Sequence, residues 1–160
     1  MTAFDAAWSL LKMPIVPGSL KETERGFAAD FIDPVSDENL QMTVRGLPSP
    51  GAGLYAKIHD PLYDELGTGL ERGFVNVTDA PISNHLTGET RTGPFWPVQA
   101  FTVPKYRKRG YGTAMYDLLA AILDRYGGYR LSPSNQRTDD AMRLWQGKSM
   151  DESWPVRDDL

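Results

Sequence analysis

The spacing of apolar and polar positions divides the chain into a strand-rich first part and a later part that contains one strong helix. Short runs bounded by turn residues predict strands over residues 26–32, 40–44, 54–58 and 73–77. A polar segment over residues 83–94 has the composition of an exposed loop. The mostly apolar run 98–103 then predicts a buried strand, which Pro104 ends because proline has no N–H to donate.

The strongest helix signal follows a basic, glycine-rich turn. Its apolar residues recur at helical spacing and form one stripe: Ala114, Met115, Leu118, Leu119, Ile122 and Tyr126. Asp117 and Asp124 are expected on the opposite face, and Gly127-Gly128 supplies a C-terminal stop. Weaker patterns predict a helix over the first dozen residues, a helical turn within 61–70, a strand over 129–131 and a helix from Thr138 or Asp139 to Gln146. The polar tail from Lys148 is expected to fray.

This order of elements predicts a single α+β (mixed α/β) domain over residues 1–160. The composition is that of a globular chain, with 41% hydrophobic and 24% charged residues. The absence of cysteine excludes a disulfide scaffold and a cysteine nucleophile, and two histidines make a histidine-rich metal centre unexpected. Without a membrane-spanning run or a basic, signal-like N-terminus, we expect a cytoplasmic protein with no membrane partner.

The net charge is −4, but the charged residues are unevenly distributed along the chain, and the basic ones gather in one turn. Residues 1–96 carry a net charge of −6 and residues 97–160 a net charge of +2, with the basic excess in Lys105-Tyr106-Arg107-Lys108-Arg109. Gly110 and Gly112 follow, at the point where a strand gives way to a helix. The first N–H groups of a helix have no internal partner, glycine lets a ligand approach the backbone closely, and basic side chains add attraction. The pattern therefore predicts a pyrophosphate cradle.

The same residues resemble a known family. The stretch Thr102-Val-Pro-Lys-Tyr-Arg-Lys-Arg-Gly-Tyr-Gly-Thr-Ala-Met-Tyr resembles motif A of the GNAT superfamily of acyl-CoA-dependent N-acyltransferases. That motif commonly reads V-x-P-x-[YF]-R-x-x-G-x-[GA], so Thr102 stands where Val is usual. Asp139-Asp-Ala141-Met-Arg-Leu144-Trp145 is similar to the family's next helix, A-x-x-[LF]-Y. The resemblance covers roughly residues 96–147.

The resemblance implies a mixed sheet with two central strands splayed apart and acetyl-CoA in the gap as acyl donor. The pantetheine arm would lie along the strand that contains Phe101, Thr102 and Val103, and an N–H near Phe101 would polarise the thioester carbonyl. The pyrophosphate would bind at Arg107, Lys108, Arg109, Gly110, Tyr111, Gly112 and Thr113. A primary amine would attack the thioester directly, and the acidic first part of the chain would suit a cationic acceptor. The family usually has two further strands at its C-terminal end; their expected absence here suggests a homodimer.

The proton-transfer positions depart from the family pattern. Gln99 and Val98 stand where a general base is usual, and Trp145 stands where the acid Tyr is usual. Three explanations stay open. Water can relay protons to a carboxylate, with Asp30, Asp33 and Glu71 as candidates. Alternatively, Ser134, Asn135 or Tyr116 orients the thiol or a water molecule, or the protein binds acyl-CoA without catalysis.

The sequence leaves two further function classes open and contains three single residues with candidate roles. One alternative is an enzyme that modifies nucleic-acid bases or carrier-bound intermediates, which the acidic net charge disfavours, and another is a non-catalytic acyl-CoA-binding module. His59 is expected at the surface at a strand end, with a general base as the alternative, and His85 lies in the polar loop. Trp154, in the tail, is a candidate for docking a partner.

Overall fold

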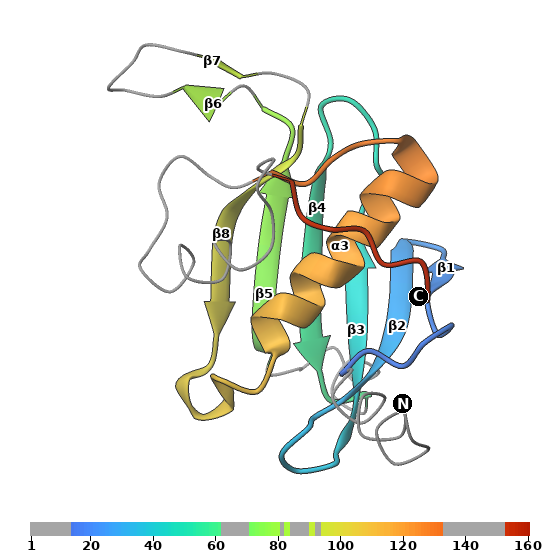
Figure 1. The fold of residues 1–160 in the computed structure, drawn as a ribbon, viewed down its shortest axis with the longest axis vertical. Helices are drawn as coiled ribbons and strands as arrows, with labels where there is room; N and C mark the ends of the chain where they lie inside the picture. The colour runs from blue at the N-terminus through green and yellow to red at the C-terminus, as the bar shows by residue number, and fades with distance from the viewer. Residues whose placement is uncertain (1–13, 62–70, 81, 84–89, 92–93, 133–152) are drawn as a thin grey trace, which may run out of the picture.

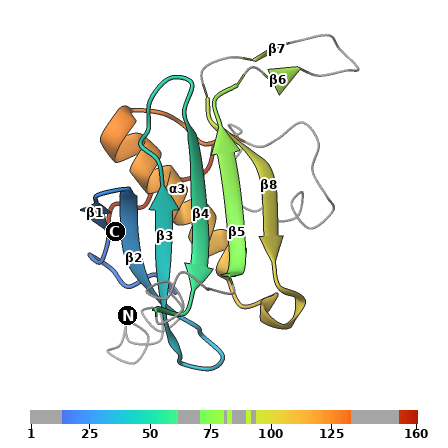
Figure 2. The same ribbon diagram turned by 180° about the vertical axis from the view of Figure 1, so that it is seen from behind.

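The computed structural model describes residues 14–61, 71–80, 82–83, 90–91, 94–132 and 153–160. In this part of the chain, a six-stranded antiparallel sheet carries one long helix across one face (Figure 1, Figure 2). In spatial order the strands are β1 (Lys21–Thr23), β2 (Gly26–Ile32), β3 (Asn39–Arg45), β4 (Gly53–His59), β5 (Glu71–Thr78) and β8 (Trp96–Thr102). A separate hairpin pairs β6 (Ile82–Ser83) with β7 (Thr90–Arg91). The fold is thus a mixed α+β fold, mostly sheet, and the predicted class is confirmed at this level.

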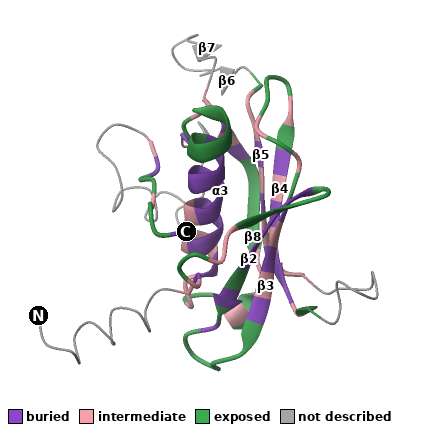
Figure 3. Ribbon diagram, turned by 90° about the vertical axis from the view of Figure 1, so that its right-hand side faces the viewer, coloured by how far each residue is buried: buried purple, intermediate pink, exposed green. Residues whose placement is uncertain are grey.

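Strict alternation along the strands creates the core. On β3 and β4, the buried residues Met42 and Val44 lie opposite the buried residues Ile58 and Ala56, while the positions between them are half exposed. Successive side chains of a strand point to opposite faces, so one face of the sheet is apolar and buried and the other carries the partly exposed side chains. Figure 3 shows the buried positions gathered where the helix and the sheet face each other. The four strands predicted before the loop are confirmed, whereas the short β1 was not predicted.

The helix α3 (Tyr111–Gly127) covers the apolar face. The predicted apolar stripe is confirmed at Leu118, Leu119 and Ile122, which are fully buried. Gly128 caps the C-terminus with φ 68°, and its N–H donates to the carbonyl of Asp124 at 3.0 Å. This left-handed cap is the stop that the paired glycines predicted.

Strand β8 is not the buried strand that the sequence predicts. Val98 is 53% exposed and Phe101 is 42% exposed, and Pro104 begins a short 3-10 helix, η1 (Pro104–Tyr106). β8 follows β5 in the sheet order, so it has a paired strand on one side only among the named strands. Its other neighbour is reduced to one isolated parallel bridge between Phe95 and Leu131, in place of the strand predicted over residues 129–131.

The expected frayed tail is also wrong for its last residues. Residues 153–160 lie along α3, and Trp154 and Leu160 are buried (Figure 1). The indole Nε1 of Trp154 donates to Asp117 Oδ1 at 2.8 Å, and its backbone N–H donates to the carbonyl of Leu131 at 2.8 Å. Asp117 therefore does not face away into solvent, because this segment covers it.

Several predicted features lie outside the described residues. They are the helix over the first dozen residues, most of the turn within 61–70, the helix from 138 or 139 to 146, and the residues His85, Ser134, Asn135 and Trp145. No helix in the described part of the chain is long and apolar enough to cross a membrane.

Candidate functional site

The turn between β8 and α3 presents a row of backbone N–H groups. Lys108 and Gly110 both have positive φ, at 63° and 85°, and Gly110 is the N-cap of the helix. The first helical bond runs from the Ala114 N–H to the Gly110 carbonyl at 2.9 Å. Within the part of the chain that the structure describes, the N–H groups of residues 108–113 find no acceptor. Six adjacent donors at the positive end of a helix dipole can hold an anion of pyrophosphate size.

Gly110 is required at the centre of this turn. A φ of 85° is strained for any residue with a side chain, and a Cβ here would approach Pro14 Cγ to 3.3 Å. Arg107 closes the other side of the turn by donating from Nε to the Thr102 carbonyl at 2.9 Å. The turn is therefore held from both sides before any ligand binds.

A buried carboxylate anchors the start of α3. Asp33 is fully buried just after β2, and its Oδ2 accepts a hydrogen bond from Tyr111 Oη at 2.6 Å and another from Arg109 Nη1 at 3.1 Å. Its Oδ1 accepts from the backbone N–H groups of Val35 and Ser36. Burial by itself raises the pKa of Asp33, but the hydrogen bonds from Tyr111, Val35, Ser36 and Arg109 outweigh it and lower the pKa to about 2. Asp33 is therefore an anion throughout the physiological range.

An aromatic and cationic stack ties the same turn to the sheet. The ring of Tyr106 stacks on Tyr111 with centroids 5.7 Å apart, and the Arg72 guanidinium lies 4.4 Å from the Tyr106 centroid. Arg72 also forms an ion pair with Glu38 at 2.8 Å and donates to Tyr111 Oη at 3.2 Å. Burial, and then the hydrogen bond to Asp33, raise the pKa of Tyr111. The tyrosine hydroxyl therefore stays protonated and works as a donor.

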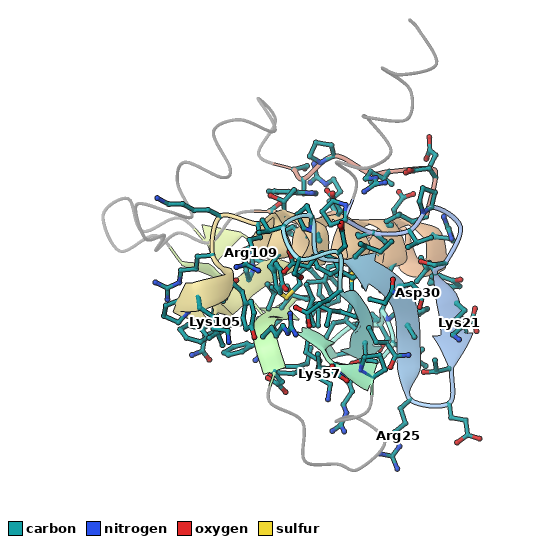
Figure 4. All side chains as sticks on the ribbon, turned by 90° about the horizontal axis from the view of Figure 1, so that it is seen from below. Lys21, Arg25, Asp30, Lys57, Lys105 and Arg109 are labelled. Atoms are coloured by element: carbon teal, nitrogen blue, oxygen red, sulfur yellow. The ribbon has the colours of Figure 1, made fainter. Side chains whose placement is uncertain are left out.

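These contacts divide the basic residues of the turn into two groups. Arg107 and Arg109 hold the turn through Thr102 and Asp33, whereas Lys108 is exposed and forms no hydrogen bond or ion pair with another described residue. Lys108 is thus the side chain of the turn that can follow an incoming anion. Figure 4 shows Arg109 near the helix layer and Lys105 further out along the turn.

The backbone of β8 offers its own donors at the edge away from β5. The Val103 N–H donates to the Arg72 carbonyl at 2.8 Å, next to the Gly73–Thr102 pair. Donors alternate along an antiparallel strand, so the Phe101 N–H also points to β5, and those of Ala100 and Thr102 point to the opposite edge. The Phe101 N–H, expected from the sequence as the donor to a thioester, therefore points to β5, and the neighbouring donors at the outer edge of β8 are those of Ala100 and Thr102.

The described candidates for proton transfer lie on α3, on β2 and the turn after it, and on β5. Tyr116 is 3% exposed and its ring packs on Trp154 with centroids 4.9 Å apart. Asp33 is occupied by the turn, Asp30 is exposed on β2, and Glu71 on β5 accepts a 2.6 Å hydrogen bond from Tyr55. Ser134 and Asn135 lie outside the described residues. The described residues therefore bring together a binding turn, but no acid–base pair beside it.

His59 was expected at the surface, and this is wrong. It is 1% exposed, with Nε2 3.1 Å from Thr43 Oγ1 and Nδ1 3.1 Å from the Asp60 carbonyl. Its position at the end of β4, opposite Glu71, places it on the sheet face away from α3. A buried imidazole with partners on both nitrogens is held in the sheet rather than presented to solvent.

Asp33 was predicted only as a candidate for proton transfer and not as the anchor of the turn, because the sequence signal around it is only that of a turn, Asp33-Pro34. Its partners Arg109 and Tyr111 follow 76 and 78 residues later. Comparisons with protein-family models, with curated proteins and with solved structures found no match to this chain. The site is therefore argued from its own geometry.

Proposed function

We propose that this chain is an acyl-CoA-dependent N-acyltransferase of the GNAT type that transfers an acetyl group from acetyl-CoA to a primary amine. The observation that carries the proposal is the set of N–H groups over residues 108–113 that find no acceptor among the described residues, together with the exposed Lys108 and the positive φ of Gly110. Coenzyme A carries a pyrophosphate next to its adenosine end, and this turn offers the donors and the charge that such a group needs.

The connection from β8 through α3 to Leu131 supports the same proposal. Phe95, just before β8, forms a parallel bridge with Leu131 after α3, and within the described residues the two segments pair at this one point. A gap that opens beyond this bridge would admit the pantetheine arm along β8. There the N–H groups of Ala100 and Thr102 would reach the thioester carbonyl and stabilise the oxyanion of the tetrahedral intermediate.

The chemistry needs no nucleophile from the protein. The amine nitrogen attacks the thioester carbon, the C–S bond breaks, and the amine proton leaves to a base while the thiolate gains a proton. Asp33 is a poor base, because its pKa is about 2 and its oxygens are occupied by four donors. Water relayed to Glu71 or Asp30, or groups among Ser134, Asn135 and Tyr116, stay the candidates for proton transfer.

Thermal unfolding with acetyl-CoA tests the binding half of the proposal. Acetyl-CoA and CoA should both raise the melting temperature, because each binds the folded state alone. Gly112→Asp should abolish the shift by placing a carboxylate against the pyrophosphate, although an acid in the first helical turn is itself favourable for folding. Arg130→Asp, a change at an exposed site in the segment after α3, should keep the shift. An unchanged shift in the Gly112 variant would place CoA elsewhere.

Thiol release tests the catalytic half. Free CoA should appear with a thiol reagent when acetyl-CoA is mixed with an accepted primary amine, and the acetylated amine should appear in equal amount. A melting shift without thiol release across a broad amine panel would favour the non-catalytic binding module. No shift with either acetyl-CoA or CoA would refute both.

A further inference from the structure

The sheet face turned away from α3, the open face, carries a hollow of about 690 Å³. Ala28 lines the hollow with only a methyl group, and Gly26, at the start of the same strand, has no side chain. A larger residue at Gly26 is excluded, since a Cβ there would collide with the carbonyl oxygen of Val44. Longer side chains from β1, the β1–β2 turn, β3 and β4 line the rest of the hollow. The hollow therefore lies where strand pairing brings these side chains around Ala28.

Positive charge predominates around the hollow, although the whole chain is acidic. Four of its lining side chains are basic, Lys21, Arg25, Arg45 and Lys57, and two are acidic, Glu24 and Glu71. Lys21, Arg25 and Arg45 form no ion pair with another described residue. Figure 4 shows Lys57 and Arg25 on the side of the sheet away from α3, with Lys21 at the β1 edge. The acidic excess of residues 1–96 is therefore not gathered here, and the hollow favours an anion.

Aromatic rings continue the open face beyond the hollow. Tyr55 and Phe74 stack with centroids 5.6 Å apart and planes at 18°, and Phe74 lies 6.0 Å from Phe101. Phe101 is 42% exposed and the Arg107 guanidinium lies 5.5 Å from its centroid. The hydroxyl of Tyr55 donates to Glu71 at 2.6 Å, which fixes the first ring of the series. These half-exposed rings offer apolar and π contacts next to the cations.

The strand register places the basic hollow and the aromatic rings along one row of the sheet. A single row of paired positions crosses the open face from edge to edge: Lys21, Ala28, Thr43, Lys57, Phe74 and Phe101. Five strand spacings make this row about 24 Å long, which exceeds the reach of a small anion. A ligand that uses the whole row must combine negative charge over the hollow with planar groups over the aromatic rings. Single-stranded nucleic acid has both, since its phosphates seek cations and its bases stack on aromatic rings.

We propose that the open face of this sheet binds single-stranded nucleic acid, with phosphates over the hollow of β1–β4 and bases against Tyr55, Phe74 and Phe101. The hollow lies on the face away from α3, whereas the turn stands at the start of α3, and the two surfaces meet where the Arg107 guanidinium lies 5.5 Å from the Phe101 centroid. The inference therefore does not depend on the proposed acyltransferase activity, and either can fail alone.

Fluorescence anisotropy with a labelled oligomer of about 12 uridines tests the proposal. Affinity should fall between about 50 and 200 mM salt, with a slope near −3 on logarithmic axes, because about four phosphates are neutralised and each contributes about 0.7. Lys57→Gln and Arg45→Gln should each reduce that slope by about 0.7. Phe74→Leu, which keeps an apolar side chain, should weaken binding roughly 5- to 100-fold with little change in slope. Arg130→Gln, the same charge change at an exposed site after α3, should match the parent protein.

Other results would overturn the proposal. They include absence of salt-dependent binding, equal weakening by Arg130→Gln, and equal affinity for an RNA duplex of the same length. Polyglutamate that binds as tightly as the oligomer and loses affinity in the same variants would assign the face to an acidic protein partner. A dimer that dissociates in the Phe74 variant would assign it to a second copy. Each variant is first shown by thermal unfolding to be folded, and retention of the acetyl-CoA shift separates this test from that of the acyl-CoA site.

Discussion

Replacing Asp33 with Asn should destabilise the protein at neutral pH, and the loss should shrink as the solution becomes acidic. The perturbation removes one negative charge from a fully buried site and keeps the shape of the side chain. The charge is stabilised by hydrogen bonds from Tyr111, Arg109 and two backbone N–H groups. Asn can accept from some of these donors, but its amide also adds a donor where the carboxylate had none.

The magnitude follows from the pKa of Asp33, which falls from 3.8 to about 2 on folding. A lowered pKa stabilises the folded state above the unfolded value, and this stabilisation is lost as the pH falls through the folded value. The difference corresponds to about 2 kcal/mol at pH 7, about 1 kcal/mol near pH 3 and less than ~0.5 kcal/mol near pH 2. Near pH 2 Asp33 is about half protonated in the folded state, so most of the electrostatic advantage over the Asn variant is gone.

Urea unfolding at several pH values between about 7 and 2.5 measures this difference directly. Asp37→Asn is the matched control, because it makes the same change at an exposed position of the same turn. It should alter the free energy of unfolding by less than ~0.5 kcal/mol at each pH. A loss in the Asp33 variant that stays constant from neutral to acidic pH would refute the electrostatic argument, because it would then reflect packing alone.

Two further predictions concern the parts that the sequence patterns did not anticipate. Trp154→Ala should lower the free energy of unfolding by about 3–5 kcal/mol in urea titrations, because a buried ring and its hydrogen bond to Asp117 are lost. As a control, Val156→Ala, at a neighbouring position that is 43% exposed, should change the free energy of unfolding by less than ~0.5 kcal/mol. Gly26→Ala should lower the free energy of unfolding by more than ~3 kcal/mol or prevent folding, as judged by circular dichroism, because the new Cβ would collide with the Val44 carbonyl. Stability equal to that of the parent protein in either Trp154→Ala or Gly26→Ala would contradict this packing.

The sheet and the helix were predictable because their signals are local. Alternation over residues 40–44 and 54–58 fixes which side chains face the core, and the stripe through Leu118 and Ile122 fixes the buried side of α3. The glycines at 110 and 128 mark both ends of that helix through their positive φ. In each case the deciding information lies within a few residues of the element itself.

The failures have a common cause, since each concerns a contact between distant parts of the chain. The tail looked polar, yet Trp154 reaches Asp117 and Leu131. The apolar composition of β8 suggested burial, although Val98 lies exposed beyond the Phe95–Leu131 bridge. Local composition cannot say what covers a strand or a tail, because that depends on which elements meet in space.

The hollow on the open face escaped prediction for a related reason. Lys21, Arg25, Arg45 and Lys57 are scattered over 37 positions of an acidic stretch, and only antiparallel pairing gathers them. A sum of charges along the sequence averages over both faces of the sheet, so it hides a patch on one of them.

The bond between Tyr111 and Asp33 has a consequence for the order of folding. It joins residues 78 positions apart, so it can form only after the intervening strands have brought the turn after β2 to the start of α3. Contacts between such distant residues carry a large loop-closure cost and form late unless the chain between them is already ordered. We therefore expect the turn at the start of α3 to gain its final shape among the last steps, which would make ligand binding there a sensitive measure of completed refolding.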